Sequence, residues 1–298
     1  MNIIQIIKKF PTQESCIKHL EQVRWDNKPI CPYCTSINTN PLVKELRHHC
    51  NGCRKSFRVT VGTIFHHTAV PLQKWFLLIS LMLNAKKGLS ACQAARDIEL
   101  RRPTVWCMMH RIRNGMKDNA DLLSGIVEMD ETYVGGKPRK ENKKDDDGND
   151  KPSNPRGRGT KKTPVVGMVE REGEVRTQVA SKYELKAKDL RKIVHNNINI
   201  RNALLVTDEY MGYNNMNATI PHLSVNHSYE YVNGDIHTNT IESFWAILKR
   251  GITGQFHWVS KKYLQNYLYE FEFKYNNRIN KGNVTFESLL GKMCYVRS

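Results

Sequence analysis

The sequence predicts an α/β protein of several domains, in which a cysteine-rich module and a helical segment precede a mixed sheet flanked by helices. Two cysteine pairs lie between residues 26 and 65, and residues 69–120 show only helical periodicity. From Gly125 onward, short β-branched runs alternate with helix-like runs. A length of 298 residues accommodates two or three domains, and an apolar fraction of 40% is sufficient for their cores.

The charge of the chain indicates a polyanionic partner. The formal net charge is +17, which favours binding to nucleic acid or to an anionic membrane over simple solubility. The longest apolar stretch, Trp75 to Leu83, is too short to span a bilayer. The first ten residues lack the charged start and the small-residue cleavage site of a signal peptide. We therefore expect no membrane partner and a cytoplasmic location, associated with the nucleoid if the source is bacterial.

Residues 1–25 are predicted to form an N-terminal helix that ends near Trp25. The part with the stronger helical pattern begins at Pro11-Thr12-Gln13-Glu14, where Thr12 is a suitable N-cap.

Residues 26–65 carry the cysteine pairs and are predicted to form a zinc ribbon. Cys31 and Cys34 form one pair, Cys50 and Cys53 the other, and a spacing of two residues lets both thiolates of a pair reach one ion. Four thiolates close a tetrahedral site, so the zinc is expected to be structural rather than catalytic. The hairpin arms are expected at 40–49 and 55–61. The adjacent histidines His48 and His49 are alternative ligands, but ordinary basic surface is the simpler interpretation.

The segment 69–120 is predicted to be a DNA-binding helix-turn-helix, with helices near 72–85, 91–98 and 104–117. An ordinary helical bundle is the alternative. The expected inward residues are Ala91, Ala94, Ala95, Ile98, Val105, Met109 and Ile112. Thr104, His110, Arg111 and Arg113 are expected to face a DNA groove, and Arg101, Arg102 and Lys117 to contact phosphate.

The remaining region, 125–295, alternates strands and helices. Strands are expected at 126–134 and 204–208, with a hairpin formed by 165–169 and 175–179. Residues 137–163 are almost wholly polar and predict a mobile loop. Helices are expected at 186–197, 241–250 and 260–276.

Three acids occupy the ends of these elements. Asp130 lies in the first strand, Asp208 ends another, and Glu242 opens a helix. Such positions can converge on one point although they are far apart in sequence. Converging carboxylates bind divalent metals, and paired metals catalyse phosphoryl transfer. Any one of these acids alone would more often be a solvated surface group, so the prediction depends on all three.

These residues resemble a known family. The two cysteine pairs, the run DETYVGG at 130–136, Thr207-Asp208, and the run HTNTIESFW at 237–245 resemble the DDE-class transposases of bacterial insertion sequences. The resemblance is to the ISXO-type branch with an N-terminal zinc ribbon, which is related to the Merlin elements. It covers residues 10 to 290.

The resemblance implies a ribonuclease-H-like catalytic domain over about 125–295. It implies two Mg²⁺ or Mn²⁺ ions, with Asp130, Asp208 and Glu242 as ligands. Glu131 is expected to point to the opposite face of a regular strand and is a weaker candidate ligand. Glu209 is doubtful for the same reason.

Three further residues are candidates for contacting DNA. Lys249 is seven residues after Glu242, so the two share a helix face; a solvated lysine is the alternative. His237 and Asn239 either orient Glu242 and contact DNA or form a turn and N-cap. Phe244, Trp245 and Leu248 are interpreted as core.

The function expected from this pattern is that of a DNA transposase. It would bind element ends in double-stranded DNA and join them to target DNA, as a homodimer or larger assembly because two ends must be brought together. A DNA-binding regulator without catalysis and a metal-dependent nuclease of the same fold are the alternatives. The regulator predicts a damaged acidic triad, whereas the triad here is intact.

Overall fold

The computed structural model describes residues 1–117, 121–136, 160, 162–181, 185–208, 211–213, 216–225 and 237–295. The chain divides into two compact units, the first formed by Met1–Asp118 with Asn277–Ser298 and the second by Asn119–Asn276. This division differs from the expected domain over 125–295, because the C-terminal segment joins the first unit. Most of the predicted loop 137–163 lies outside the described residues.

The N-terminal segment forms two helices rather than one, α1 (Ile3–Lys9) and α2 (Gln13–Trp25). Pro11 has no N–H to continue a helical ladder, and the chain turns there. Each helix then begins with its own capping box, at Asn2 and at the predicted Thr12.

The cysteine-rich module contains a three-stranded antiparallel sheet in the order β1-β2-β3. Its strands are β1 (Thr39–Leu42), β2 (Arg47–Cys50) and β3 (Ser56–Phe57). The predicted arm 40–49 is thus itself a hairpin. It turns at Val43–Glu45, and Leu46 adopts a left-handed conformation that ends the turn.

Four further helices complete the first unit. Ser90 caps α4 by accepting from the Gln93 N–H. The last helix, α9, has no counterpart among the expected elements; its Phe286 is fully buried against Phe10 and Phe76. These helices are α3 (Leu72–Asn84), α4 (Ala91–Asp97), α5 (Arg102–Gly115) and α9 (Gly282–Met293).

The second unit is built on a five-stranded mixed sheet in the order β6-β5-β4-β7-β8. The predicted hairpin is β5–β6, and β5 pairs antiparallel with β4. On the other side β7 pairs parallel with β4, and β8 parallel with β7. β7 begins six residues earlier than expected, and β8 was not expected. The strands are β4 (Leu123–Val134), β5 (Thr163–Glu170), β6 (Val175–Val179), β7 (Ile198–Asp208) and β8 (His222–Val225).

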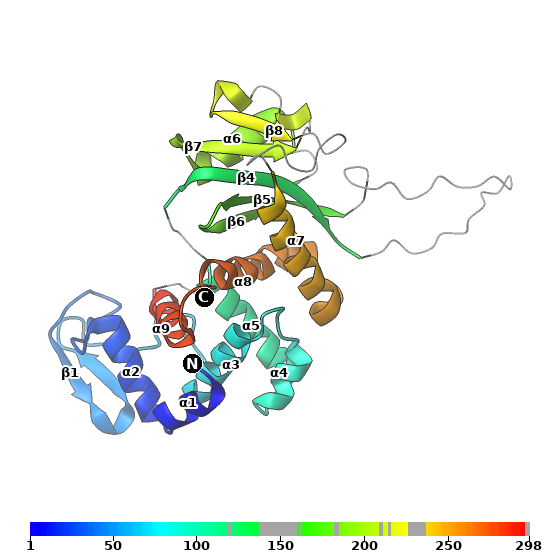
Figure 1. Ribbon diagram of the computed structural model, residues 1–298. Coiled ribbons are helices and arrows are strands. Elements are labelled where there is room, and N and C mark those ends of the chain that lie inside the picture. Colours follow the sequence, from blue (N-terminus) through cyan, green and yellow to red (C-terminus); the bar gives the residue numbers. More distant parts are fainter. Residues whose placement is uncertain are drawn as a thin grey trace, which may run out of the picture. The chain divides into compact units, whose positions relative to one another are not determined.

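Helices cover both faces of this sheet (Figure 1), with α6 (Ala187–Asn197) on one face and α7 (Asn239–Gly251) and α8 (Leu264–Asn276) on the other. β4 serves both layers because alternate side chains of a strand point to opposite faces. Val127 and Met129 join the core under α6, whereas Val134 joins the core under α7 and α8. The zinc-ribbon module, the helical segment and this α/β layer structure confirm the predicted fold class.

Within the part of the chain that the structure describes, no helix combines the length and apolar character needed to cross a bilayer.

Candidate metal centres

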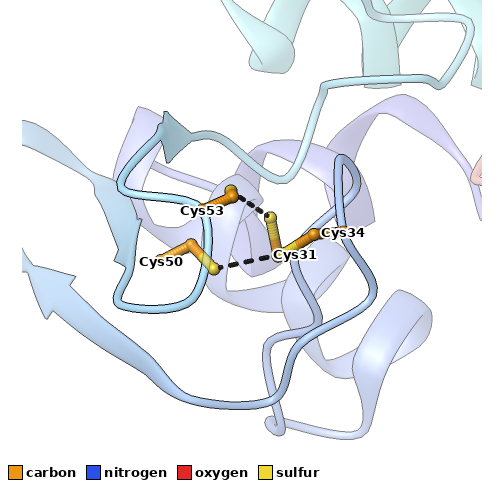
Figure 2. Close-up of side chains that lie close together, drawn as sticks. All are labelled: Cys31, Cys34, Cys50 and Cys53. Carbon is orange, nitrogen blue, oxygen red and sulfur yellow. Dashed lines mark hydrogen bonds between the residues drawn. The ribbon is translucent and has the colours of Figure 1, made fainter.

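The four cysteines of the ribbon converge on one point. Figure 2 shows their sulfurs turned toward one another, and all four lie within 4.8 Å of each other. The Sγ–Sγ distance is 3.6 Å between Cys31 and Cys53 and 3.5 Å between Cys34 and Cys50. A tetrahedral zinc site with Zn–S bonds of about 2.3 Å requires sulfurs about 3.8 Å apart. The residues therefore fit a closed, structural zinc site.

The backbone around the second pair also favours zinc. The backbone N–H of Cys53 is the largest of several neighbouring groups that together lower the pKa of the Cys50 thiol to about 6. Zinc binds the thiolate, so this donor favours the ligating form. Gly52 is tightly placed, because a Cβ there would lie 3.3 Å from Ser36.

The histidines of β2 are not zinc ligands in this arrangement. His48 is buried, pairs with Glu21 at 2.8 Å and packs against the rings of Trp25 and Phe57. The expectation of basic surface is thus wrong for His48, which is part of the ribbon's core. His49 shares a hydrogen bond with Ser56.

Asp130 and Asp208 are brought together by the parallel register of β4 and β7. Glu128 pairs with Val206, and two residues further along each strand are the two acids. Both therefore point to the same face of the sheet at the same edge of the ladder. Asp130, Asp208 and Glu131 each offer an oxygen within 4.8 Å of the others.

Glu131 is a member of this acidic cluster, against the expectation that it would be a weaker candidate. Its neighbours Met129 and Tyr133 do pack toward α6, as strand alternation requires. Its carboxylate nevertheless reaches the other two acids near the strand end, where the buried Tyr213 side chain lies close to all three. Burial and the three carboxylates raise the pKa of Tyr213, so its hydroxyl stays protonated and can donate.

The clustering has an electrostatic cost. Burial first, and then the charges of Glu131 and Asp208, raise the pKa of Asp130 to about 7, although the donors from the Glu131 N–H and the Trp245 indole lower it. A divalent cation reverses this cost because it supplies the opposite charge. Carboxylate oxygens are also the ligands that Mg²⁺ prefers, so the residues fit such an ion.

Glu242 stands outside this cluster, so the structure brings together two of the three predicted acids. It is exposed in the first turn of α7, where the Thr238 hydroxyl donates to its Oε1 at 3.2 Å. Three residues on, the Trp245 indole N–H donates to Asp130 Oδ2 at 3.1 Å. Residues three apart are neighbours on a helix surface. Glu242 is therefore next to Trp245, a residue of α7 that contacts the cluster.

Comparison with known proteins identifies the family. The ISXO2-like transposase domain matches residues 122–276, and the transposase zinc-ribbon domain matches residues 11–56. The chain belongs to the ISXO2-like transposase family. The match to the first domain spans the whole sheet and the helix that carries Glu242.

Relatives of this ISXO2-like chain include an uncharacterized protein in the transposable element ISH50 of Halobacterium salinarum. The two are 29% identical over 279 residues, which is 90% of this chain and 92% of the relative. Among solved structures, the Mos1 strand transfer complex overlaps weakly, with 12% identity over 74% of both chains and a TM-score of 0.33. The Mos1 paired-end complex with the left transposon end gives 13% identity, 75% and 80% coverage, and a TM-score of 0.30.

The predicted DNA-contacting residues of the helical segment divide into two groups. Arg101, Arg102 and Lys117 are exposed, as is Thr104. Arg113 is only 1% exposed and His110 only 7%, so the expectation that they face a groove is wrong. Both are buried residues of α5, like Val105, Met109 and Ile112, which are confirmed as inward residues.

Arg111 is held within the protein. Its Nη2 donates to the His66 carbonyl at 2.6 Å, and its guanidinium lies over the Trp75 ring. Burial lowers the pKa of this arginine. These contacts make it a structural group of the helical segment.

Near α7, Lys249 and Asn239 are exposed. Asn239 is the first helical residue and Thr238 is the N-cap, so Asn239 does not cap the helix. His237 lies beside Glu128, at 3.3 Å from its Oε1. Phe244, Trp245 and Leu248 are buried and confirmed as core. Glu209 lies outside the described residues.

Sequence reasoning missed Glu128, which is completely buried in β4 and bonds to the start of α7. A signal was present in the spacing. Glu128 is two residues before Asp130, so the two acids share a face of the strand.

Proposed function

We propose that the chain is an active DNA transposase, which binds element ends and carries out metal-dependent strand cleavage and strand transfer. The observation that carries this proposal is the pairing of Asp130 with Asp208 through the β4–β7 register, with the α7 helix held against Asp130 by Trp245. Family membership supports the same function. A regulator without catalysis has no use for carboxylates gathered at such an electrostatic cost.

In this proposal Asp130, Asp208 and Glu242 bind two Mg²⁺ or Mn²⁺ ions, and Glu131 is a further candidate ligand. When bound, such ions stabilise the charge on the attacking and leaving oxygens of a phosphodiester. The acids would hold these ions next to the scissile phosphate. Water cleaves the strand at the element end, and the freed 3′-hydroxyl then attacks a target phosphodiester in line, so no covalent bond to the protein forms.

DNA is held, in this proposal, by the exposed basic residues Arg101, Arg102, Lys117 and Lys249 on a chain with net charge +17. Two element ends have to be brought together, so the active species is a dimer or a larger assembly. The zinc ribbon supports recognition of the element ends.

A strand-transfer assay tests the proposal. Duplexes that carry the terminal repeats flanking this gene, with a labelled recessed 3′-hydroxyl, are incubated with protein, Mg²⁺ and a supercoiled target. Label joined to the target is the expected result. Cleavage of uncut ends without joining would indicate the nuclease, and end binding without either product would indicate the regulator. The same end blocked as a 3′-deoxy terminus is the control, because it has no oxygen to attack with.

A further inference from the structure

The helix that carries Glu242 begins without a cap from its own neighbourhood. Thr238 occupies the N-cap position of α7, but its side chain does not cap the helix and its hydroxyl donates to Glu242 instead. The first N–H groups of a helix have no intrahelical acceptor and need one from elsewhere.

Glu128 supplies that acceptor from the neighbouring strand. Its Oε2 accepts the backbone N–H of Thr240 at 2.9 Å and that of Ile241 at 3.1 Å. Its Oε1 accepts the Thr240 hydroxyl at 3.0 Å. These are the N–H groups that an N-cap side chain would ordinarily satisfy, and a carboxylate at this end of a helix is favoured by the helix dipole.

The buried charge of Glu128 is compensated by the turn between β5 and β6. Arg171 Nε donates to Glu128 Oε1 at 2.8 Å. Arg171 Nη2 also donates to the carbonyl of His237 at 2.9 Å, so the residues just before α7 are fixed as well. A buried carboxylate is tolerated when it is paired and fully hydrogen-bonded, as here.

A second anchor lies on the same face of β4. Two residues after Glu128, Asp130 accepts the Trp245 indole N–H. Glu242 lies between the two anchored points of α7, Ile241 and Trp245. Its position relative to Asp130 and Asp208 therefore depends on both contacts with β4.

We propose that Glu128 is a positioning residue: by capping α7 from β4, it fixes where Glu242 stands relative to Asp130 and Asp208. The inference rests on the proposed function in taking Glu242 as a metal ligand. Glu128 itself does not touch the ion or the DNA. It acts through the helix start, in the way that groups bonded to metal ligands orient those ligands elsewhere.

Mn²⁺ binding to the full-length zinc-loaded protein, measured by isothermal titration calorimetry without DNA, tests the inference. Glu128→Gln keeps the shape of the side chain but replaces the carboxylate. We expect Mn²⁺ affinity to fall by about tenfold, the loss typical of a partner that orients a metal ligand. Glu242→Gln is expected to weaken binding at least as much. The double variant should bind no more weakly than Glu242→Gln alone, because Glu128 acts through that residue.

Glu272→Gln is the matched control for loss of a buried carboxylate. Glu272 is 7% exposed and accepts the Thr177 N–H at 2.7 Å, which ties α8 to β6 in the same unit and away from the start of α7. Both Glu→Gln changes should lower the melting temperature, but this one should leave Mn²⁺ affinity unchanged. An equal loss of Mn²⁺ affinity in the two variants would overturn the inference, since general destabilisation would then explain both.

Failure of the inference and failure of the proposed function give different results. Normal Mn²⁺ binding by both Asp130→Asn and Glu242→Gln would overturn the metal site itself, and the inference with it. Weakened binding by those two variants with an unchanged Glu128→Gln would overturn the inference alone. If Glu128→Gln does not fold, the test uses Thr240→Val, which removes one donor to Glu128. A Mn²⁺ affinity about threefold weaker than that of the unchanged protein supports the inference, and an unchanged Mn²⁺ affinity overturns it.

Discussion

At the scale of single residues, the acidic site depends on which side chains share a face of a strand. Glu128 and Asp130 both point toward α7 and perform different tasks, one holding the helix start and the other meeting Asp208. Alternation in a strand makes their shared face readable from spacing, but not the different task of each. The burial of Arg113 was not readable in the same way, because an arginine on an amphipathic helix is usually exposed.

Asp130→Asn and Asp208→Asn are expected to abolish strand cleavage and to leave end binding within about twofold. Asparagine keeps an acceptor for the Trp245 indole but loses the charge that binds the ion. Metal-ion catalysis contributes several kcal/mol, so the cleavage rate should fall by about a thousandfold or more. Single-turnover cleavage in Mg²⁺ measures this. The control is Glu172→Gln, which changes an exposed acid in the β5–β6 turn. Cleavage by either aspartate variant at the rate of this control would refute the assignment of Asp130 and Asp208 to the active site.

At the scale of elements, α7 is set against the sheet by a close approach to β5. A Cβ on Gly167 would lie 2.5 Å from two carbons of the Trp245 ring, and that ring is buried. Only glycine fits at this point. The contact fixes the depth of α7, and with it the Trp245–Asp130 hydrogen bond.

Gly167→Ala should therefore destabilise the second unit by about 1–3 kcal/mol, the usual cost of overpacking a core. Cleavage should fall as well, because Trp245 is displaced from Asp130. Chemical denaturation and single-turnover cleavage measure the two effects. Gly254→Ala is the matched control, since a Cβ there meets nothing within 4 Å. Equal stability of the two variants would show that α7 adjusts without cost.

The zinc ribbon is the other element whose stability is concentrated in a few atoms. Its sheet has strands of four, four and two residues, which is little apolar core for a folded module. A structural zinc contributes on the order of 10 kcal/mol of binding free energy to such a fold.

Replacing Cys31 and Cys34 together by serine should remove the zinc, unfold residues 26–60 and weaken binding to element ends. Elemental analysis, amide hydrogen exchange and end-binding titrations measure the three effects. Cys92→Ser with Cys107→Ser is the control, because these exposed cysteines lie outside the ribbon. Undiminished end binding by the Cys31 and Cys34 variant would argue against a role of the ribbon in recognition.

At the scale of the whole molecule, the chain is a strongly basic protein in two units, and the first is completed by its last helix. Phe286 of α9 packs against the rings of Phe10 and Phe76, and Glu287 pairs with Lys9 and His19. The chain therefore leaves the first unit after α5, forms the sheet, and returns. Contiguous stretches of sequence do not delimit its units.

The net charge of +17 predicts a steep dependence of DNA binding on salt. Each phosphate neutralised by a lysine or arginine releases counterions, so the logarithm of the affinity should fall against the logarithm of salt concentration with a slope of about −4 or steeper. Fluorescence anisotropy with a labelled terminal repeat, between about 50 and 300 mM salt, measures this slope. A slope near zero would show that the basic excess serves another purpose.

The sequence by itself determined the four cysteines of the ribbon, the two strand acids and most of the helices, because each depends on local spacing or local periodicity. Tertiary structure alone decided three things. It joined α9 to the first unit, it buried Arg113, and it gave the capping of α7 to Glu128, which lies 112 residues before the first N–H that it accepts. Each of these depends on which surfaces meet after the chain has folded back on itself, and no local pattern encodes that meeting.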